Sequence, residues 1–172
     1  METISFDRLL LKTAFCCMAS DGNIDKKEVA LIKKMCDKST VFKDLDFKKE
    51  INLFVNGLNA SGKEFINDYF ELLKEADLSN EEELTLIEYV INTIKADDLI
   101  EYSEIKFFKV IIHNLKISDE QILEVYSDIE SWLEEDIVVD KSIDKLINQY
   151  FDSAVLSQFE LISNTDIESL QN

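Results

Sequence analysis

The sequence predicts an all-α protein, a single-domain bundle of seven to eight helices, from three observations. The 172-residue chain has no proline and only three glycines, whereas a β-rich fold of this length needs more turn residues. Apolar residues make up 46% of the chain and recur at helical spacing along most of it. The Ser/Asp-x-x-Glu/Gln pattern, which caps helix N-termini, occurs at residues 25–28, 61–64, 79–82 and 118–121.

The predicted helices are bounded by these caps, by glycines or by breaks in the apolar pattern. Gly22 supplies a left-handed stop after the first helix, and Gly57 is expected to end the third. Ile117 and Ile122 form a hydrophobic staple around the fourth capping box. We expect helices over about 5–20, 25–38 and 44–56, a fourth opened by 61–64, a fifth over 79–95, a sixth holding 105–115, a seventh over 118–133 and an eighth over 140–162.

One domain is expected over residues 1–162, because a chain of this length can bury one sizeable core. The polar residues 163–172 predict a frayed tail. Acidic Glu2 and Asp7 flank the first apolar residues, so no secretory signal is expected. No run of ~18 apolar residues predicts a membrane span, and the expected location is the cytoplasm.

A helix–elbow–helix pattern occurs twice in the chain, with an offset of 76 residues. Apolar positions of the flanking helices correspond as well, for example Phe15 with Ile91. The repeat predicts two pseudo-symmetric helical hairpins, each with an acidic elbow. The corresponding elbow residues are Asp21 and Asp97, Ile24 and Ile100, Asp25 and Glu101, and Glu28 and Glu104.

Residues 19–28 have the form A-x-D-G-x-I-D-x-x-E at the end of an apolar helix. This motif, repeated in weaker form in a small acidic helical protein, resembles the TerB-like tellurite-resistance family. It is also similar to the TerB-like N-terminal domain of DjlA-type co-chaperones. The resemblance covers about residues 5–130, so the helix over 140–162 is an addition to it. The second copy departs from the family pattern, with Asp98 and Leu99 in place of glycine and a polar residue.

The resemblance implies an all-helical domain with a stress-response role and a metal-binding cluster of acidic side chains at the elbows. Hard oxygen ligands of this kind suit calcium, magnesium or manganese. An open EF-hand loop is not expected, because its positions 1 and 3 would fall on Cys17 and Ala19. The candidate metal ligands are Asp21, Asp25 and Glu28 in the first elbow and Asp97, Asp98, Glu101 and Glu104 in the second.

The alternative interpretation of the elbows is structural. Asp25 and Glu101 would cap helices, and Ile24 and Ile100 would plug the core. Two functional hypotheses follow. In one, the protein is a cytosolic TerB-like stress-response module that binds a divalent cation. In the other, it is an acidic helical adaptor that docks a basic partner protein, and the elbows only support the fold.

The net charge of −18 is concentrated in the second half of the chain. Residues 1–75 carry −1, residues 76–115 carry −6 and residues 116–172 carry −11. Such a chain repels phosphate backbones and anionic membrane surfaces, so neither nucleic acid nor membrane is an expected partner. A cation or a basic protein surface fits the charge, and acidity that simply maintains solubility is the other interpretation.

Catalytic patterns are scarce, and an enzyme is not expected. The three cysteines Cys16, Cys17 and Cys36 lack Cys-x-x-Cys spacing and are expected to be buried reduced thiols, although Cys17 and Cys36 could approach one another across the hairpin. The single histidine, His113, is expected at the surface or the core boundary. No glycine-rich phosphate loop or zinc-binding pattern occurs.

Overall fold

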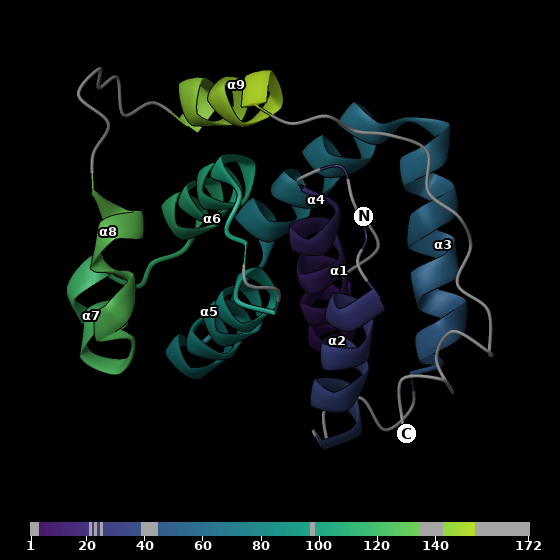
Figure 1. Ribbon diagram of the computed structural model, residues 1–172, viewed down its shortest axis with the longest axis horizontal. Coiled ribbons are helices and arrows are strands. Elements are labelled where there is room, and N and C mark those ends of the chain that lie inside the picture. The colour runs from purple at the N-terminus through teal and green to yellow at the C-terminus, as the bar shows by residue number, and fades with distance from the viewer. Residues whose placement is uncertain are drawn as a thin grey trace.

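A computed structural model of the chain is an all-helical bundle (Figure 1). It describes residues 4–20, 22, 24, 26–38, 45–96, 99–134 and 143–153, and the regular elements within those ranges are helices only. They are α1 (Phe6–Ala19), α2 (Lys26–Lys38), α3 (Phe47–Ala60), α4 (Gly62–Glu75), α5 (Asn80–Ile94), α6 (Tyr102–Asn114), α7 (Asp119–Val125), the 3₁₀ turn η2 (Ser127–Ile129), α8 (Glu130–Leu133) and α9 (Ile143–Ser153).

The central element is α1. It contacts α2, α3, α4, α5 and α6, and its most extensive contact is with α5. Every residue from Thr13 to Ala19 is buried, so the second half of α1 is enclosed on all sides instead of presenting one apolar face. The Thr13 hydroxyl donates to the Leu9 carbonyl at 2.8 Å and accepts a hydrogen bond from the Tyr69 hydroxyl at 2.8 Å. These bonds satisfy two polar groups inside the core.

The connection between α3 and α4 differs from the sequence prediction. Gly57 lies inside α3, which continues to Ala60, so the expectation that Gly57 ends the helix is wrong. A Cβ atom at position 57 would lie 2.8 Å from the Phe65 ring. That ring is held against Phe15 and Phe54, with centroid distances of 6.0 and 6.3 Å. Glycine at position 57 therefore permits the close packing of α4 on α3.

Two of the predicted capping boxes are confirmed. The Ser79 hydroxyl accepts from the Glu82 backbone N–H at 3.2 Å, and the Glu82 carboxylate accepts from the Ser79 N–H at 2.8 Å. Ser118 and Gln121 make the same reciprocal pair at 3.2 and 3.0 Å. These boxes fix where α5 and α7 begin.

The capping box predicted at Ser61 is wrong. The Ser61 hydroxyl donates to the Glu64 carboxylate at 2.8 Å and makes no cap to the α4 backbone. The reason is that Ser61 also ends α3, with φ −161° and ψ 82°, so a single residue links the two helices. Asp25, the remaining predicted cap, lies outside the described residues.

The seventh predicted helix is divided into α7, η2 and α8. Tyr126 leaves the helical region with φ −125° and ψ 70°. The change of direction buries Ile129 and Trp132, and the Trp132 ring meets Phe108 of α6 edge-on at 5.5 Å. Tertiary packing therefore outweighs the helical pattern of the sequence at this point.

The last described helix, α9, packs mainly on α6, as Figure 1 shows. Its Tyr150 is fully buried, with ring centroids 5.5 Å from Phe107 and 6.1 Å from Phe70. Although α9 lies beyond the region of TerB-like resemblance, it contributes to the same hydrophobic core. The rest of the predicted eighth helix and the predicted tail lie outside the described residues.

Candidate functional site at the helix elbows

The first elbow joins α1 to α2 through a left-handed glycine. Gly22 has φ 82°, which confirms its predicted role. Its backbone N–H donates to the Ala19 carbonyl at 3.0 Å, and the buried Ser20 hydroxyl donates to the Cys17 carbonyl at 2.6 Å. These bonds satisfy the carbonyls of Cys17 and Ala19 in the last turn of α1.

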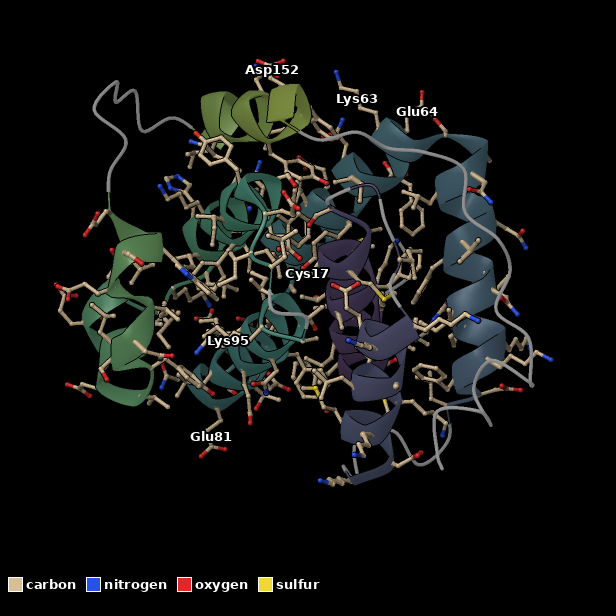
Figure 2. The ribbon with its side chains drawn as sticks, in the orientation of Figure 1. Cys17, Lys63, Glu64, Glu81, Lys95 and Asp152 are labelled. Atoms are coloured by element: carbon tan, nitrogen blue, oxygen red, sulfur yellow. The ribbon has the colours of Figure 1, made fainter. Side chains whose placement is uncertain are left out.

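The second elbow joins α5 to α6. The Lys95 N–H donates to the Ile91 carbonyl at 3.0 Å, which ends α5. The Glu101 N–H donates to the Glu104 carboxylate at 2.8 Å, so Glu104 helps to begin α6. Figure 2 labels Glu81 at one end of α5 and Lys95 at the other.

Three of the seven predicted metal ligands lie in the described part of the chain. Glu28 and Glu104, which correspond in the repeat, are 1% and 0% exposed, and Glu101 is half-buried. Within the described ranges, no three His, Cys, Asp or Glu side chains come together as a metal site. The metal site therefore stays a prediction, since its other members, Asp21, Asp25, Asp97 and Asp98, fall outside those ranges.

The helices leave no room for open calcium loops of the EF-hand type. The residues at loop positions 1 and 3 of the first copy, Cys17 and Ala19, are buried inside α1. Thr93, at position 1 of the second copy, is buried inside α5 and donates its hydroxyl proton to the Tyr89 carbonyl at 2.6 Å. The sequence-based exclusion of this loop type agrees with the helix bounds.

Large apolar side chains are exposed at the second elbow. Leu99, Ile100 and Tyr102, called the elbow patch below, are 63%, 45% and 60% exposed. The expectation that Ile100 plugs the core is therefore wrong, whereas Ile24 does pack against the core. The Lys106 ammonium lies 4.8 Å from the Tyr102 ring centroid and makes a cation–π contact with that ring.

A third buried glutamate has a role that the sequence pattern did not reveal. Glu83 lies in the first turn of α5 and is 3% exposed. Its carboxylate accepts from the backbone N–H groups of Lys116 and Ile117 at 3.1 and 2.9 Å. The sequence predicted only a favourable interaction with the helix dipole, because the long-range contact to the α6–α7 connection has no local signal.

The cysteine thiols are buried and reduced, as predicted. Burial raises the pKa of the Cys16 thiol to about 12 and that of Cys36 to about 12, with smaller opposing effects of Lys12 and Lys33. Cys17 lies near the middle of the bundle (Figure 2), and its thiol points at the Val90 carbonyl of α5. Such thiols are poor nucleophiles at neutral pH.

A groove between α2 and α5 is a second feature that the sequence analysis missed. It has a volume of about 500 Å³ and is lined by both lysines and apolar residues. A signal was available in α2, where Lys27, Leu31 and Lys34 follow one another at i, i+4 and i+7. We call it the lysine groove; its lining residues are Lys27, Ala30, Leu31, Lys34, Asn92, Lys95 and Ala96.

Comparison with known proteins found no matching family model, no matching curated protein and no matching solved structure. Among the helices in the described ranges, none has the length and apolar character that crossing a lipid bilayer requires.

Proposed function

We propose that the protein is an acidic helical interaction module that docks a basic, amphipathic segment of another protein at its second elbow. The observation that carries this proposal is the elbow patch, where three neighbouring large apolar side chains, Leu99, Ile100 and Tyr102, are exposed. Clustered apolar side chains on a surface mark interaction sites more often than single ones do. An aromatic residue such as Tyr102 is also a frequent anchor at protein interfaces.

The charge around the elbow patch specifies the chemistry of the partner. In the sequence Asp97 and Asp98 precede the patch, and Glu101 lies within it. A partner helix with leucine-like side chains would bury the patch, and flanking lysines or arginines would complement the acidic sequence around it. The net charge of −18 would also steer a basic partner toward the protein and repel nucleic acid.

The buried glutamates support a structural role for part of each elbow. Glu28 and Glu104 are enclosed at equivalent places, and Glu104 accepts a backbone hydrogen bond from Glu101. A carboxylate that helps to begin a helix is not available as a freely moving metal ligand. This favours the adaptor hypothesis over cation binding.

A synthetic basic amphipathic helical peptide with a fluorescent label is a direct probe of this proposal. Its binding is measured by fluorescence anisotropy with wild type, with Leu99→Ser/Tyr102→Ser and with Val125→Ser. Val125 is a matched control, because it is an apolar side chain, 59% exposed, at the end of α7. We expect the double variant to bind at least about tenfold more weakly, a loss of about 1.4 kcal/mol, and Val125→Ser to bind as wild type does. Equal binding by all three proteins would contradict the proposal.

The second candidate function is the TerB-like one, a cytosolic stress-response module of the tellurite-resistance type that binds calcium, magnesium or manganese at its elbows. It is supported by the repeat. The first residues of α2 and α6, Lys26 and Tyr102, are 76 positions apart, and so are their last residues, Lys38 and Asn114. Packing also corresponds, since α2 contacts α5 and α6 contacts α1. These features agree with two pseudo-symmetric hairpins.

The cation hypothesis is tested by thermal melts of wild type and Asp21→Asn in chelator, Mg²⁺, Ca²⁺ and Mn²⁺. A cation at ~100 times its dissociation constant should stabilise wild type by ~2.7 kcal/mol, and Asp21→Asn should lose that gain. If no divalent ion stabilises wild type beyond the effect of monovalent salt, cation binding at the first elbow is excluded. If both proteins gain equally, the ion acts elsewhere on the acidic surface.

A further inference from the structure

Residues 118–134, called the strap below, contain α7, η2 and α8 and lie at one edge of the bundle (Figure 1). Most of their side chains are exposed, and only three are buried: Ile122, Ile129 and Trp132. The second half of α1, by contrast, is buried on all sides. Few buried apolar contacts are typical of a segment that opens at a low cost in free energy.

The elements of the strap support one another. Both α7 and α8 contact η2, and the main contact of the strap with the rest of the bundle is that of α8 with α6. The capping box of Ser118 and Gln121, which begins α7, lies entirely within the strap. On α8, the Trp132 ring meets Phe108 of α6 at a centroid distance of 5.5 Å. Movement of the strap away from α6 would break this ring contact and leave the capping box intact.

The chain that leads into the strap is held firmly on α5. The buried Glu83 carboxylate accepts from the backbone N–H groups of Lys116 and Ile117 at 3.1 and 2.9 Å, and Ile117 itself is buried. Loss of these bonds would leave buried polar groups unsatisfied, so they are costly to break. The connection before Ser118 is therefore a fixed point about which the strap can move.

The polar contacts that hold the body of the strap in place are at the surface. Asp128 of η2 forms an ion pair with Lys95, which Figure 2 shows on the side of α5 that faces the strap. The Lys109 ammonium of α6 donates to the Glu134 carbonyl at 2.8 Å. Exposed contacts of this kind contribute little to stability, because water competes for both partners. The strap is thus fastened strongly at its first end and weakly along its length.

We propose that the strap opens and closes as one unit, about a hinge at Lys116 and Ile117, while the rest of the bundle stays folded. In the open state the bonds from Lys95 and Lys109 are broken, and Trp132 no longer covers Phe108. Phe108 belongs to α6, the helix that begins at the second elbow. Opening therefore adds apolar surface to the helix that carries Tyr102 of the elbow patch. This device does not depend on the binding of a partner there.

Native-state hydrogen exchange of the full chain, followed by mass spectrometry at several low urea concentrations, measures the proposed opening. After correction for intrinsic rates, the strap should exchange as one unit and at least about tenfold faster than α1 and α5. Its exchange should also depend less on urea, because opening of a small unit exposes less surface than global unfolding does. The proposal is overturned if the strap and α1 have the same rate and urea dependence, or if α7 and α8 exchange independently.

Two core substitutions separate opening of the strap from global unfolding. Trp132→Leu removes a contact that is lost when the strap opens, so strap exchange should rise at least about tenfold. Ile51→Val is the matched control, because Ile51 is buried in α3, whose main contacts are with α1 and α4. It should raise exchange in α1 and α3 about two- to tenfold and leave strap exchange unchanged. If Ile51→Val accelerates the strap as much as α1, the chain opens only as a whole and the proposal fails.

A lysine pair tests the weaker fastening along the strap. Lys109→Met removes the ammonium that holds the Glu134 carbonyl, and strap exchange should rise about two- to fivefold. Lys74→Met makes the same change of charge at an exposed position of α4 and should leave strap exchange as in wild type. Circular dichroism establishes that all variants are folded. Equal strap exchange in the two lysine variants would contradict the role of Lys109 in holding the strap closed.

Discussion

The two elbows have the same helical frame but different surfaces. In the first, Gly22 makes the turn with positive φ, Ala19 is buried and Ile24 packs against the core. In the second, the equivalent of Ile24 is exposed Ile100, and the equivalent of Ala19 is Lys95, which reaches out to Asp128. The two turns therefore carry different side chains, although α2 and α6 begin 76 positions apart. The second elbow therefore exposes apolar side chains, whereas the isoleucine of the first elbow packs against the core.

The net charge also differs between the part of the chain that holds the first elbow and the part that holds the second. Residues 1–75 carry −1, and the remaining residues carry −17. The half that contains the first elbow also supplies Lys27 and Lys34 to the lysine groove. Both hairpins contribute to the core, since α1 packs most extensively on α5, so the difference lies in the elbows, and the following changes test it.

The largest expected effect is at Glu83, whose equivalent in the first repeat is Asp7. Glu83→Ala removes a buried carboxylate that accepts from the N–H groups of Lys116 and Ile117 and leaves both donors unsatisfied. We expect a loss of about 2–3 kcal/mol in the free energy of unfolding. Asp7→Ala should cost about 0.5 kcal/mol, because that carboxylate makes only a local bond, to the Arg8 N–H. Urea unfolding measures both, and equal losses would contradict the assigned role of Glu83.

An intermediate effect is expected from the two elbow isoleucines. Ile24→Ala should destabilise the protein by about 1–2 kcal/mol, because it removes methyl groups that pack on the core. Ile100→Ala, at an exposed position, should cost less than about 0.5 kcal/mol. The comparison of the elbows fails if the second substitution proves as costly as the first in thermal or chemical unfolding.

A smaller effect is expected at the turn of the first elbow. Gly22→Ala forces a side chain into the left-handed region, which should cost about 1 kcal/mol. Gly62→Ala is the control, since Gly62 is the first residue of α4 and its φ is not positive. The control should be neutral or slightly stabilising, because alanine favours helix. A neutral Gly22→Ala would mean that the turn does not depend on positive φ.

The smallest effect concerns the ion pair of the second elbow. The hydrogen bond from Lys95 lowers the pKa of Asp128 below its ordinary value. A carboxyl group whose folded pKa is lowered stabilises the protein above its unfolded pKa of about 3.9 and loses this contribution as the pH falls through the folded pKa. Asp128→Asn should therefore lower Tm slightly at pH 7, less so in high salt, and leave Tm unchanged at a pH below the folded pKa. A difference in Tm that is independent of pH would contradict this account.

The fold was predictable from sequence where the signal is local. Helical spacing, the boxes at Ser79 and Ser118 and the positive φ of Gly22 need only neighbouring residues, and each is found. Gly57 and Tyr126 were misjudged because their roles depend on Phe65 and on the packing of Trp132, which local patterns do not encode. The break at Tyr126 also accounts for the greater number of helices than was predicted.

The candidate surfaces were less predictable than the fold. The repeat suggested that Ile100 would behave as Ile24 does, but burial depends on what covers a residue and not on its position in a repeat. The lysine groove joins residues of α2 to residues of α5, so no single stretch of sequence contains it. The acidic elbow motif, by contrast, was visible in the sequence. The metal site predicted from it stays a prediction, which the melts of Asp21→Asn test.

The enclosure of α1 has a consequence for the order in which the protein can fold as it is synthesised. Residues Thr13 to Ala19 emerge from the ribosome early, yet the helix that contacts α1 most extensively, α5, ends at Ile94. Until α5 has emerged, the side of α1 that packs on it is exposed to solvent. A nascent chain with such an exposed apolar surface is prone to aggregate. Chains truncated before α5 should therefore be insoluble, whereas chains extended through α6 should become progressively protected from protease.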